Sequence, residues 1–220
     1  MLRSVEGLDG SGTDLGRLLS LSDGVFAFAL TFLVVTLILP AISTGGPPSL
    51  AAYLGKLEPG FLAYGLSFFV IATWWDAHHR LFSAIVRYDA WLVRLNNLFL
   101  LAISITPFLV GILFDYGPGR GVPAGSTQLA ILLYAGVQSL AGVDLLAVWR
   151  HATRAHRLVD PALPAEWIRA TERHQVAVVL VFLASMGIVA FFPVGAELAW
   201  IFMIVVMVRR PKPRLPPRPA

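Results

Sequence analysis

Long apolar stretches, separated by short polar or Gly/Pro-rich segments, recur along the whole chain. Six of them approach the roughly 20 residues that a helix needs to cross about 30 Å of hydrocarbon. They cover about 18–39, 59–80, 92–114, 129–149, 176–192 and 196–208. The pattern predicts an all-α integral membrane protein with six transmembrane helices.

Prolines mark several boundaries of these predicted helices. Pro40 should end the first helix, Pro59 suits the first turn of the second, and Pro193 should separate the fifth from the sixth. Pro107 lies inside the third helix and should kink it or free a carbonyl. The second helix is expected to stay apolar to Trp75 and to continue past the bilayer surface through DAHHRLF.

The two ends differ from the membrane domain of residues 18–209. Residues 1–17 form a polar, Gly-rich segment, and no small-residue cleavage site follows it, so we expect the first apolar run to be retained. Residues 210–220 are basic and Pro-rich, which predicts an extended tail. Attraction to anionic lipids is the expected role of this basic tail, and binding to a proline-recognition module is the alternative.

Composition supports a membrane protein. Hydrophobic residues make up 57% of the chain and charged residues 14%, and the mean hydropathy is +0.73, whereas charged residues make up about a quarter of a soluble domain. The chain has no cysteine, which excludes disulfides, thiolate metal sites and cysteine nucleophiles. No soluble catalytic domain is indicated.

The distribution of Lys and Arg predicts the orientation. Only Lys56 and Arg120 fall on one predicted side. The other side holds Arg3, Arg17, Arg80, Arg87, Arg94, Arg150, Arg154, Arg157, Arg169, Arg173, Arg209, Arg210, Lys212, Arg214 and Arg218. This asymmetry predicts a multi-pass plasma-membrane protein with both termini in the cytoplasm.

A carboxylate near the cytoplasmic end of the first helix needs a donor. A charge at the centre of a spanning helix costs about 2.5–3.5 kcal/mol, so Asp23 should face protein partners near the helix end. Candidate donors at the same depth lie on the next two helices. The predicted network comprises Arg17, Ser22, Asp23, Trp75, His79 and Asn96. It acts either as a static clasp or as a gate or proton-sensitive latch.

Other chemistry has weaker support. His78 and His79 are adjacent and diverge by about 100° on a helix, so no metal site is expected. Three histidines and two glutamates are expected on one cytoplasmic loop, but they form no motif for an enzyme. These are His151, His156, His174, Glu166 and Glu172.

Three motifs resemble one known family. They are LSDGVFAFALT at 21–31, preceded by Arg17, WWDAHHRLF at 74–82, and LNNLFLLAISITPF at 95–108. In this order they are similar to the first-, second- and third-helix motifs of the transmembrane protein 175 family of endo-lysosomal potassium channels and their prokaryotic relatives. The last three predicted helices match only in hydropathy and number.

The resemblance implies a potassium-permeable cation channel and no enzyme. Prokaryotic members carry a single six-helix repeat and form homotetramers in the lipid bilayer, with the first helices lining the pore and no TVGYG-type filter. The implied permeant ion is K⁺, without a cofactor and without nucleic acid as a partner. Anionic lipids are expected at the basic cytoplasmic face.

The family pattern assigns roles to residues of the first helix. Phe28, Phe32 and Val35 match the apolar constriction, and Thr31 matches a threonine linked to ion discrimination. On a helix the three constriction residues fall within about 60° of one another, which agrees with one pore-lining face. Ordinary helix packing is the alternative explanation of this stripe, and Asp23 lies on the other side of the helix.

This chain departs from the family pattern at two points. Leu21 replaces a phenylalanine of the first-helix motif, and Phe28 and Phe32 stand where smaller aliphatic residues are usual. Since apolar constrictions gate by dewetting, rings of phenylalanine predict low resting conductance.

A secondary transporter of a small ion or solute is the alternative function. Such proteins have Gly/Pro-broken helices and polar groups at the midplane. Pro107 with Gly111, and Gln138 with Asp144, are the hints of that arrangement.

Overall fold

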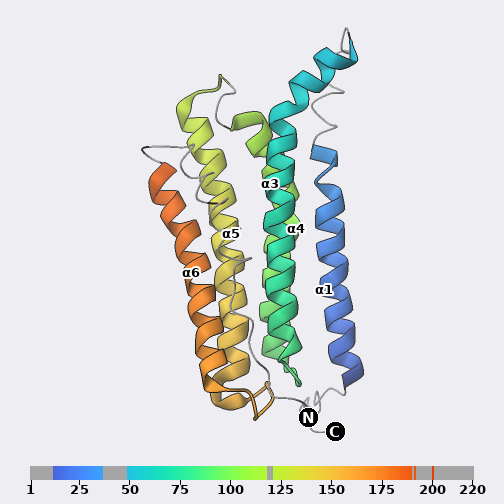
Figure 1. Ribbon diagram of the computed structural model, residues 1–220, viewed down its shortest axis with the longest axis vertical. Coiled ribbons are helices and arrows are strands. Elements are labelled where there is room, and N and C mark those ends of the chain that lie inside the picture. Colours follow the sequence, from blue (N-terminus) through green and yellow to red (C-terminus); the bar gives the residue numbers. More distant parts are fainter. Residues whose placement is uncertain (1–11, 37–48, 118–120, 190, 192–199, 201–220) are drawn as a thin grey trace, which may run out of the picture.

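The fold is a bundle of long helices that run alternately up and down (Figure 1). A computed structural model describes residues 12–36, 49–117, 121–189, 191 and 200. The helices are α1 (Gly12–Phe32), α3 (Leu50–Ser83), α4 (Ala90–Tyr116), α5 (Ala124–Thr153), the short η1 (Arg154–His156) and α6 (Ala165–Val189). Within the described residues, the only strand-like pairing is one isolated bridge between two residues outside the helices. The predicted all-helical fold is therefore confirmed.

Several of these helices can cross a bilayer. Within the described residues, α1, α4, α5 and α6 are both long and apolar enough. The 34 residues of α3 span about 50 Å at 1.5 Å per residue, more than the hydrocarbon core. The predicted sixth span at 196–208 and the tail at 210–220 lie outside the described residues apart from Trp200, so the count of six stays a prediction.

The second predicted helix is longer than expected at its start. α3 begins at Leu50, so the expectation that the helix starts at Pro59 is wrong. A proline inside a helix removes one backbone donor and bends the chain without necessarily ending it. The first part of α3 is bent away from the rest in Figure 1. Its other end continues through 74–82 to Ser83, as predicted.

The first predicted helix is interrupted by a turn. α1 ends at Phe32 and a turn follows at residues 33–34, so a continuous helix to residue 39 is wrong. The amides of Val34 and Thr36 bond to carbonyls three residues back, at 3.3 and 3.1 Å. Because β-branched residues favour helix weakly, the run of Val and Thr here weakens the regular ladder. Residues 37–39 lie outside the described part.

The segment between the fourth and fifth predicted spans is mostly helical. α5 extends to Thr153 and α6 begins at Ala165, so only η1 and a short connection separate them. The prediction that three histidines and two glutamates lie on a loop is therefore wrong for four of them, which lie on helices. They are His151, Glu166, Glu172 and His174.

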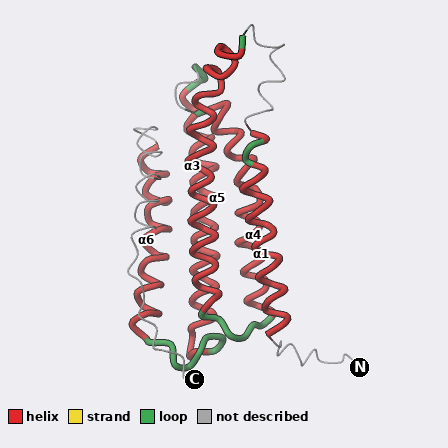
Figure 2. Tube along the Cα trace, turned by 45° about the vertical axis from the view of Figure 1, so that its right-hand side comes forward, coloured by secondary structure: helices red, strands yellow, loops and turns green. Residues whose placement is uncertain are grey.

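α4 lies at the centre of the helix packing. It contacts α1, α3 and α5, and α6 packs on the other side of α5 (Figure 2). Trp74 of α3 is fully buried between Phe99 of α4, edge to face at 6.1 Å, and Phe182 of α6, stacked at 6.2 Å. α4 also runs unbroken through Pro107, so the transporter-like break suggested at Pro107 and Gly111 is absent from this described helix.

Candidate pore-lining site

The face of α1 that points away from the rest of the subunit carries two phenylalanines. Phe28 is 62% exposed and Phe32 44% exposed. Their rings stack nearly parallel with centroids 5.2 Å apart. Phe26 and Ala29, on the opposite side of α1, are buried against the subunit. α1 therefore presents an apolar face that no other described helix of the chain covers.

Thr31 lies on this exposed part of α1 beside the two rings. Its hydroxyl donates to the backbone carbonyls of Ala27, at 2.9 Å, and Phe28, at 3.0 Å. A hydroxyl has one proton and two acceptor lone pairs. Because the proton points back at the helix, the oxygen can offer its electron pairs outward, as a cation ligand requires.

Val35, the third expected constriction residue, has a different setting. It lies beyond the turn that ends α1 and is half-buried. Val35 therefore does not continue the exposed face of α1 that Phe28 and Phe32 share.

Asp23 and Trp75 join α1 to α3 near the polar end of the bundle. The Trp75 indole N–H donates to the Asp23 carboxylate at 2.9 Å, and Trp75 is 41% exposed. His79 is exposed and stacks on the Trp75 ring at 5.5 Å. Arg17 is exposed. This contact sits at the edge of the subunit.

A second contact, behind the first, is fully buried. The Asn96 amide donates to Ser22 Oγ at 3.1 Å, and the Asn96 carbonyl oxygen lies 2.8 Å from His78 Nε2. Since a carbonyl oxygen only accepts, His78 Nε2 carries the proton. The three side chains are at most 1% exposed. Ser22, Asn96 and His78 thus connect α1, α4 and α3.

The structure changes one member of the predicted network. Among the residues described, His78 makes the buried hydrogen bond, whereas His79 lies outside it. The period of apolar residues on α3 indicates this difference: Trp74 and Leu81 are buried at helical spacing around His78. The stacking of His78 on Phe82, at 4.2 Å, places its ring in the same core.

A further series of buried side-chain hydrogen bonds was not predicted from the sequence. Trp74 Nε1 donates to Gln138 Oε1 at 2.8 Å, and Gln138 Nε2 donates to Thr106 Oγ1 at 3.1 Å. The Thr106 hydroxyl in turn donates to the Ala102 carbonyl at 2.9 Å. A glutamine in the middle of an apolar span was the available signal, because such a group needs partners in lipid. Here it links α3, α5 and α4, so it serves packing.

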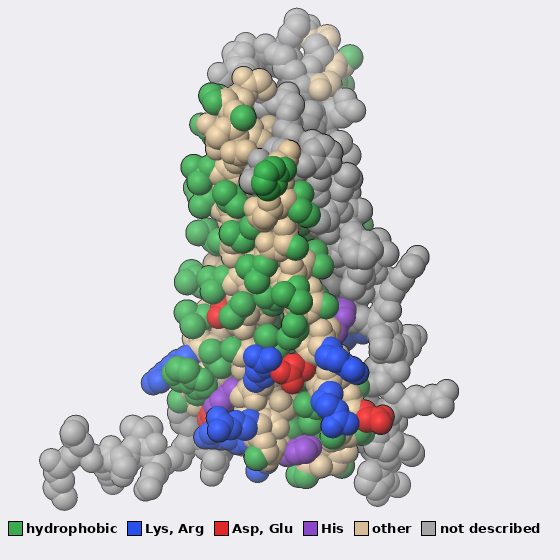
Figure 3. Space-filling model, turned by 90° about the vertical axis from the view of Figure 1, so that its left-hand side faces the viewer, with side chains coloured by type: hydrophobic (Ala, Val, Ile, Leu, Met, Phe, Trp, Pro, Cys, Tyr) green, Lys and Arg blue, Asp and Glu red, His purple; other side chains and the backbone are tan. Residues whose placement is uncertain are grey.

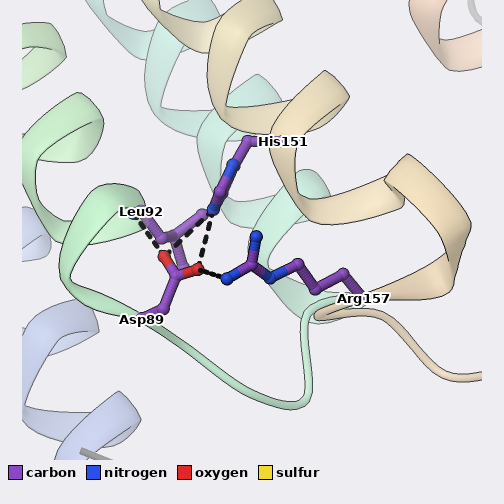
Figure 4. Close-up of polar contacts among 4 residues, drawn as sticks. All are labelled: Asp89, Leu92, His151 and Arg157. Atoms are coloured by element: carbon purple, nitrogen blue, oxygen red, sulfur yellow. Dashed lines mark hydrogen bonds and ion pairs between the residues drawn. The ribbon is translucent and has the colours of Figure 1, made fainter.

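The junction of α4 and α5 holds a charged cluster at the polar end (Figure 4). Asp89 caps α4 by accepting from the Leu92 amide at 2.8 Å. Its carboxylate also lies 2.9 Å from His151 Nε2 and 3.3 Å from the Arg157 guanidinium. Desolvation alone would raise the pKa of Asp89, but the Leu92 N–H, His151 and Arg157 outweigh it and lower the pKa below 3.8.

Metal ligands do not gather in the part of the chain that the structure describes. No group of three or more His, Asp or Glu side chains is placed there to hold an ion. The polar contacts described above pair donors with acceptors inside the protein.

Comparisons with known proteins identify relatives over the same helices. Residues 17–107 match the model of the family described as endosomal/lysosomal potassium channel TMEM175. A protein of Streptomyces collinus named as a potassium channel is 35% identical over 156 residues, which is 71% of this chain and 73% of the relative. One of Chamaesiphon minutus, also so named, is 32% identical over 147 residues, or 67% of this chain and 70% of the relative.

Solved structures show the same fold. The crystal structure of a lysosomal potassium-selective channel TMEM175 homologue from Chamaesiphon minutus matches with a TM-score of 0.72 at 22% identity, over 89% of this chain and 97% of that one. A variant of the potassium channel MtTMEM175, crystallised with a nanobody–MBP fusion protein, matches with a TM-score of 0.62 at 14% identity, over 94% and 95%.

Proposed function

This chain belongs to the TMEM175 family of potassium channels, and on that premise we propose that it forms a homotetrameric, potassium-permeable channel whose pore is lined by α1. The relatives named as potassium channels support the ion. No cofactor is needed, because ions move down their gradient without covalent chemistry.

One observation carries the pore assignment. Phe28 and Phe32, two large side chains on one helix, stack on a face that the subunit leaves open. One subunit offers this face from a single helix, so it encloses a path only when copies of α1 meet around an axis. Four copies would place rings of apolar side chains at the levels of Phe28 and Phe32, with Val35 as a proposed third level.

The proposed pore selects ions without a TVGYG segment, which the sequence lacks. Thr31 is the proposed discriminating residue, since its oxygen is free to accept from the pore side while its proton is bonded to the helix. The Ser22, Asn96 and His78 contact would hold α1 in place against α3 and α4, while Asp23 and Trp75 join α1 to α3 at the edge.

The proposed setting is a plasma membrane with both termini in the cytoplasm. The described arginines of the predicted cytoplasmic set belong to the helix ends that meet at one end of the bundle (Figure 1), which supports the positive-inside assignment. Anionic lipids are the proposed neighbours of that end.

The decisive experiment is reconstitution of the purified chain in liposomes with K⁺ or Na⁺ gradients. A channel gives potassium flux that rises without saturation and single-channel steps in a planar bilayer. Saturating flux with exchange kinetics would identify a carrier and overturn the proposal. The mass in detergent provides a second check, because a stable monomer would leave α1 without partners to close a pore.

A further inference from the structure

The outer face of α6 changes from basic to apolar along one line of residues. Arg169 and Arg173 are exposed, and they line an open cavity of about 280 Å³ together with Glu172 and Val176. Figure 3 shows blue side chains gathered on the lower part of this side of the molecule and green ones above them. The transition lies near residue 176, where the fifth hydrophobic span was predicted to begin.

The charge of this cavity is positive. Glu172 is paired with Arg150 of α5, with Arg150 Nε 2.6 Å from Glu172 Oε1. Neither Arg169 nor Arg173 forms an ion pair with another residue in the described part of the chain. Two guanidinium groups, one helical turn apart, are therefore available to a negatively charged ligand.

An apolar stripe continues from the arginines along the same face. Val176, Leu180 and Leu183 follow Arg169 and Arg173 at helical spacing, and the two leucines are 57% and 48% exposed. From Arg173 to Leu183 the helix rises about 15 Å, half of the roughly 30 Å hydrocarbon thickness. Arg173 and the stripe together thus extend over about the thickness of one leaflet's hydrocarbon.

We propose that this face of α6 is a binding site for an anionic phospholipid of the cytoplasmic leaflet. The phosphate binds between Arg169 and Arg173, whose planar groups suit its oxygens, and an acyl chain lies along Val176, Leu180 and Leu183. The cavity is at the small end of ligand sites, which are about 300–1,000 Å³, so it holds a headgroup and leaves the chains outside. The inference rests on the proposed membrane orientation and extends the expected lipid contact to a defined site.

Native mass spectrometry of the purified protein, titrated with phosphatidylglycerol or phosphatidylcholine, tests the site. We expect the wild type to retain phosphatidylglycerol preferentially. The double variant Arg169→Gln/Arg173→Gln should bind it roughly 30-fold more weakly, from the usual contribution of two surface basic residues. Circular dichroism and gel filtration establish that the variant is folded.

Two further variants separate a lipid site from general charge. Arg87→Gln/Arg154→Gln removes the same charge from exposed positions at the same end and should retain the preference. Leu180→Ala/Leu183→Ala should weaken binding while both arginines remain. An equal loss in the Arg87/Arg154 variant would overturn the site.

Inorganic phosphate distinguishes a lipid from a free anion. It should fail to displace phosphatidylglycerol at millimolar concentration. Displacement by phosphate, together with unchanged binding in the leucine variant, would show an anion site instead of a lipid site. Potassium flux in liposomes of phosphatidylcholine alone tests the channel separately, so either proposal can fail without the other.

Discussion

The rings of Phe28 and Phe32 stack on each other along α1, nearly parallel and 5.2 Å apart. Each ring supports the other's position through this contact, which is worth about 0.5–1.5 kcal/mol beyond burial in aromatic pairs. In a pore built from α1, the pair would act as one apolar wall of two levels. Removing one ring should therefore loosen the other.

Phe28→Ala is expected to increase potassium flux. A smaller side chain widens the proposed constriction and lowers the cost of wetting it, and it also frees Phe32 to move. Flux into liposomes, normalised to reconstituted protein, measures the effect. Phe108→Ala is the matched control, because Phe108 is 63% exposed on α4, against 62% for Phe28. Flux no higher than in wild type, or an equal rise in the control, would contradict the gate.

Thr31→Val should reduce discrimination between K⁺ and Na⁺ while leaving the protein folded. Valine keeps the shape but removes the oxygen. The variant removes this oxygen from every copy of α1, and a difference of about 0.5–1.5 kcal/mol per polar contact changes a permeability ratio at least roughly 2- to 10-fold. Reversal potentials under K⁺/Na⁺ gradients measure the ratio, and Thr31→Ser, which restores the hydroxyl, should recover it. An unchanged ratio in Thr31→Val would remove Thr31 from the selectivity proposal.

Asn96→Leu should destabilise the bundle more than Trp75→Phe does. The first leaves the buried His78 N–H without its acceptor, at about 1–3 kcal/mol, whereas the second removes a contact at the exposed edge, worth about 1 kcal/mol or less. Thermal unfolding in detergent compares the two. Equal loss would mean that the edge contact with Asp23 matters as much as the buried one. Unchanged flux per folded Asn96→Leu protein would favour a static clasp over a latch.

Much of the site could be predicted because lipid makes polar residues conspicuous. Ser22, Asp23, Trp75 and Asn96 stand out in apolar segments, and their hydrogen bonds follow from the need to pair polar groups that water does not reach. The period of α1 also separates the exposed Phe28 from the buried Phe26. For these positions, the period of hydrophobic residues and the polar residues that interrupt it were sufficient to predict the site.

Other features depend on neighbours that a single helix does not reveal. His78 and His79 are adjacent and equally polar on α3, and the sequence does not show the stacking of His78 on Phe99 of α4 that accompanies the burial of His78. The end of α1 at Phe32 depends on a change of backbone hydrogen bonding that hydropathy does not register. The helical start of α6 was missed because its first turns are polar and lie before the apolar run.

Gly142→Ala should destabilise the contact between α5 and α6. A Cβ at Gly142 would lie 2.8 Å from Val179 Cγ2 and 3.3 Å from Trp74 Cη2. Valine is stiff about χ1, so overpacking of about 1–3 kcal/mol should exceed the gain of about 1 kcal/mol from alanine in a helix. Gly136→Ala on the same helix meets nothing within 4 Å and should be neutral or stabilising. Thermal unfolding of both variants gives the comparison, and a more stable Gly142→Ala would show that Val179 yields easily.

Asp89→Asn should lower stability at neutral pH by an amount that disappears in acid. Folding lowers the pKa of Asp89 below 3.8, so the carboxylate contributes its full stabilisation above 3.8 and loses it as the pH falls through the lower folded pKa. Asparagine can still cap α4 but has no charge for His151 and Arg157. The difference in unfolding midpoint between wild type and variant should therefore be present at pH 5 and shrink as the pH falls below 3.8. Asp115→Asn, an exposed change at the other end of α4, controls for loss of one negative charge. A gap between wild type and Asp89→Asn that persists unchanged at pH 3 would show that the carboxylate charge is not what ties α4 to α5.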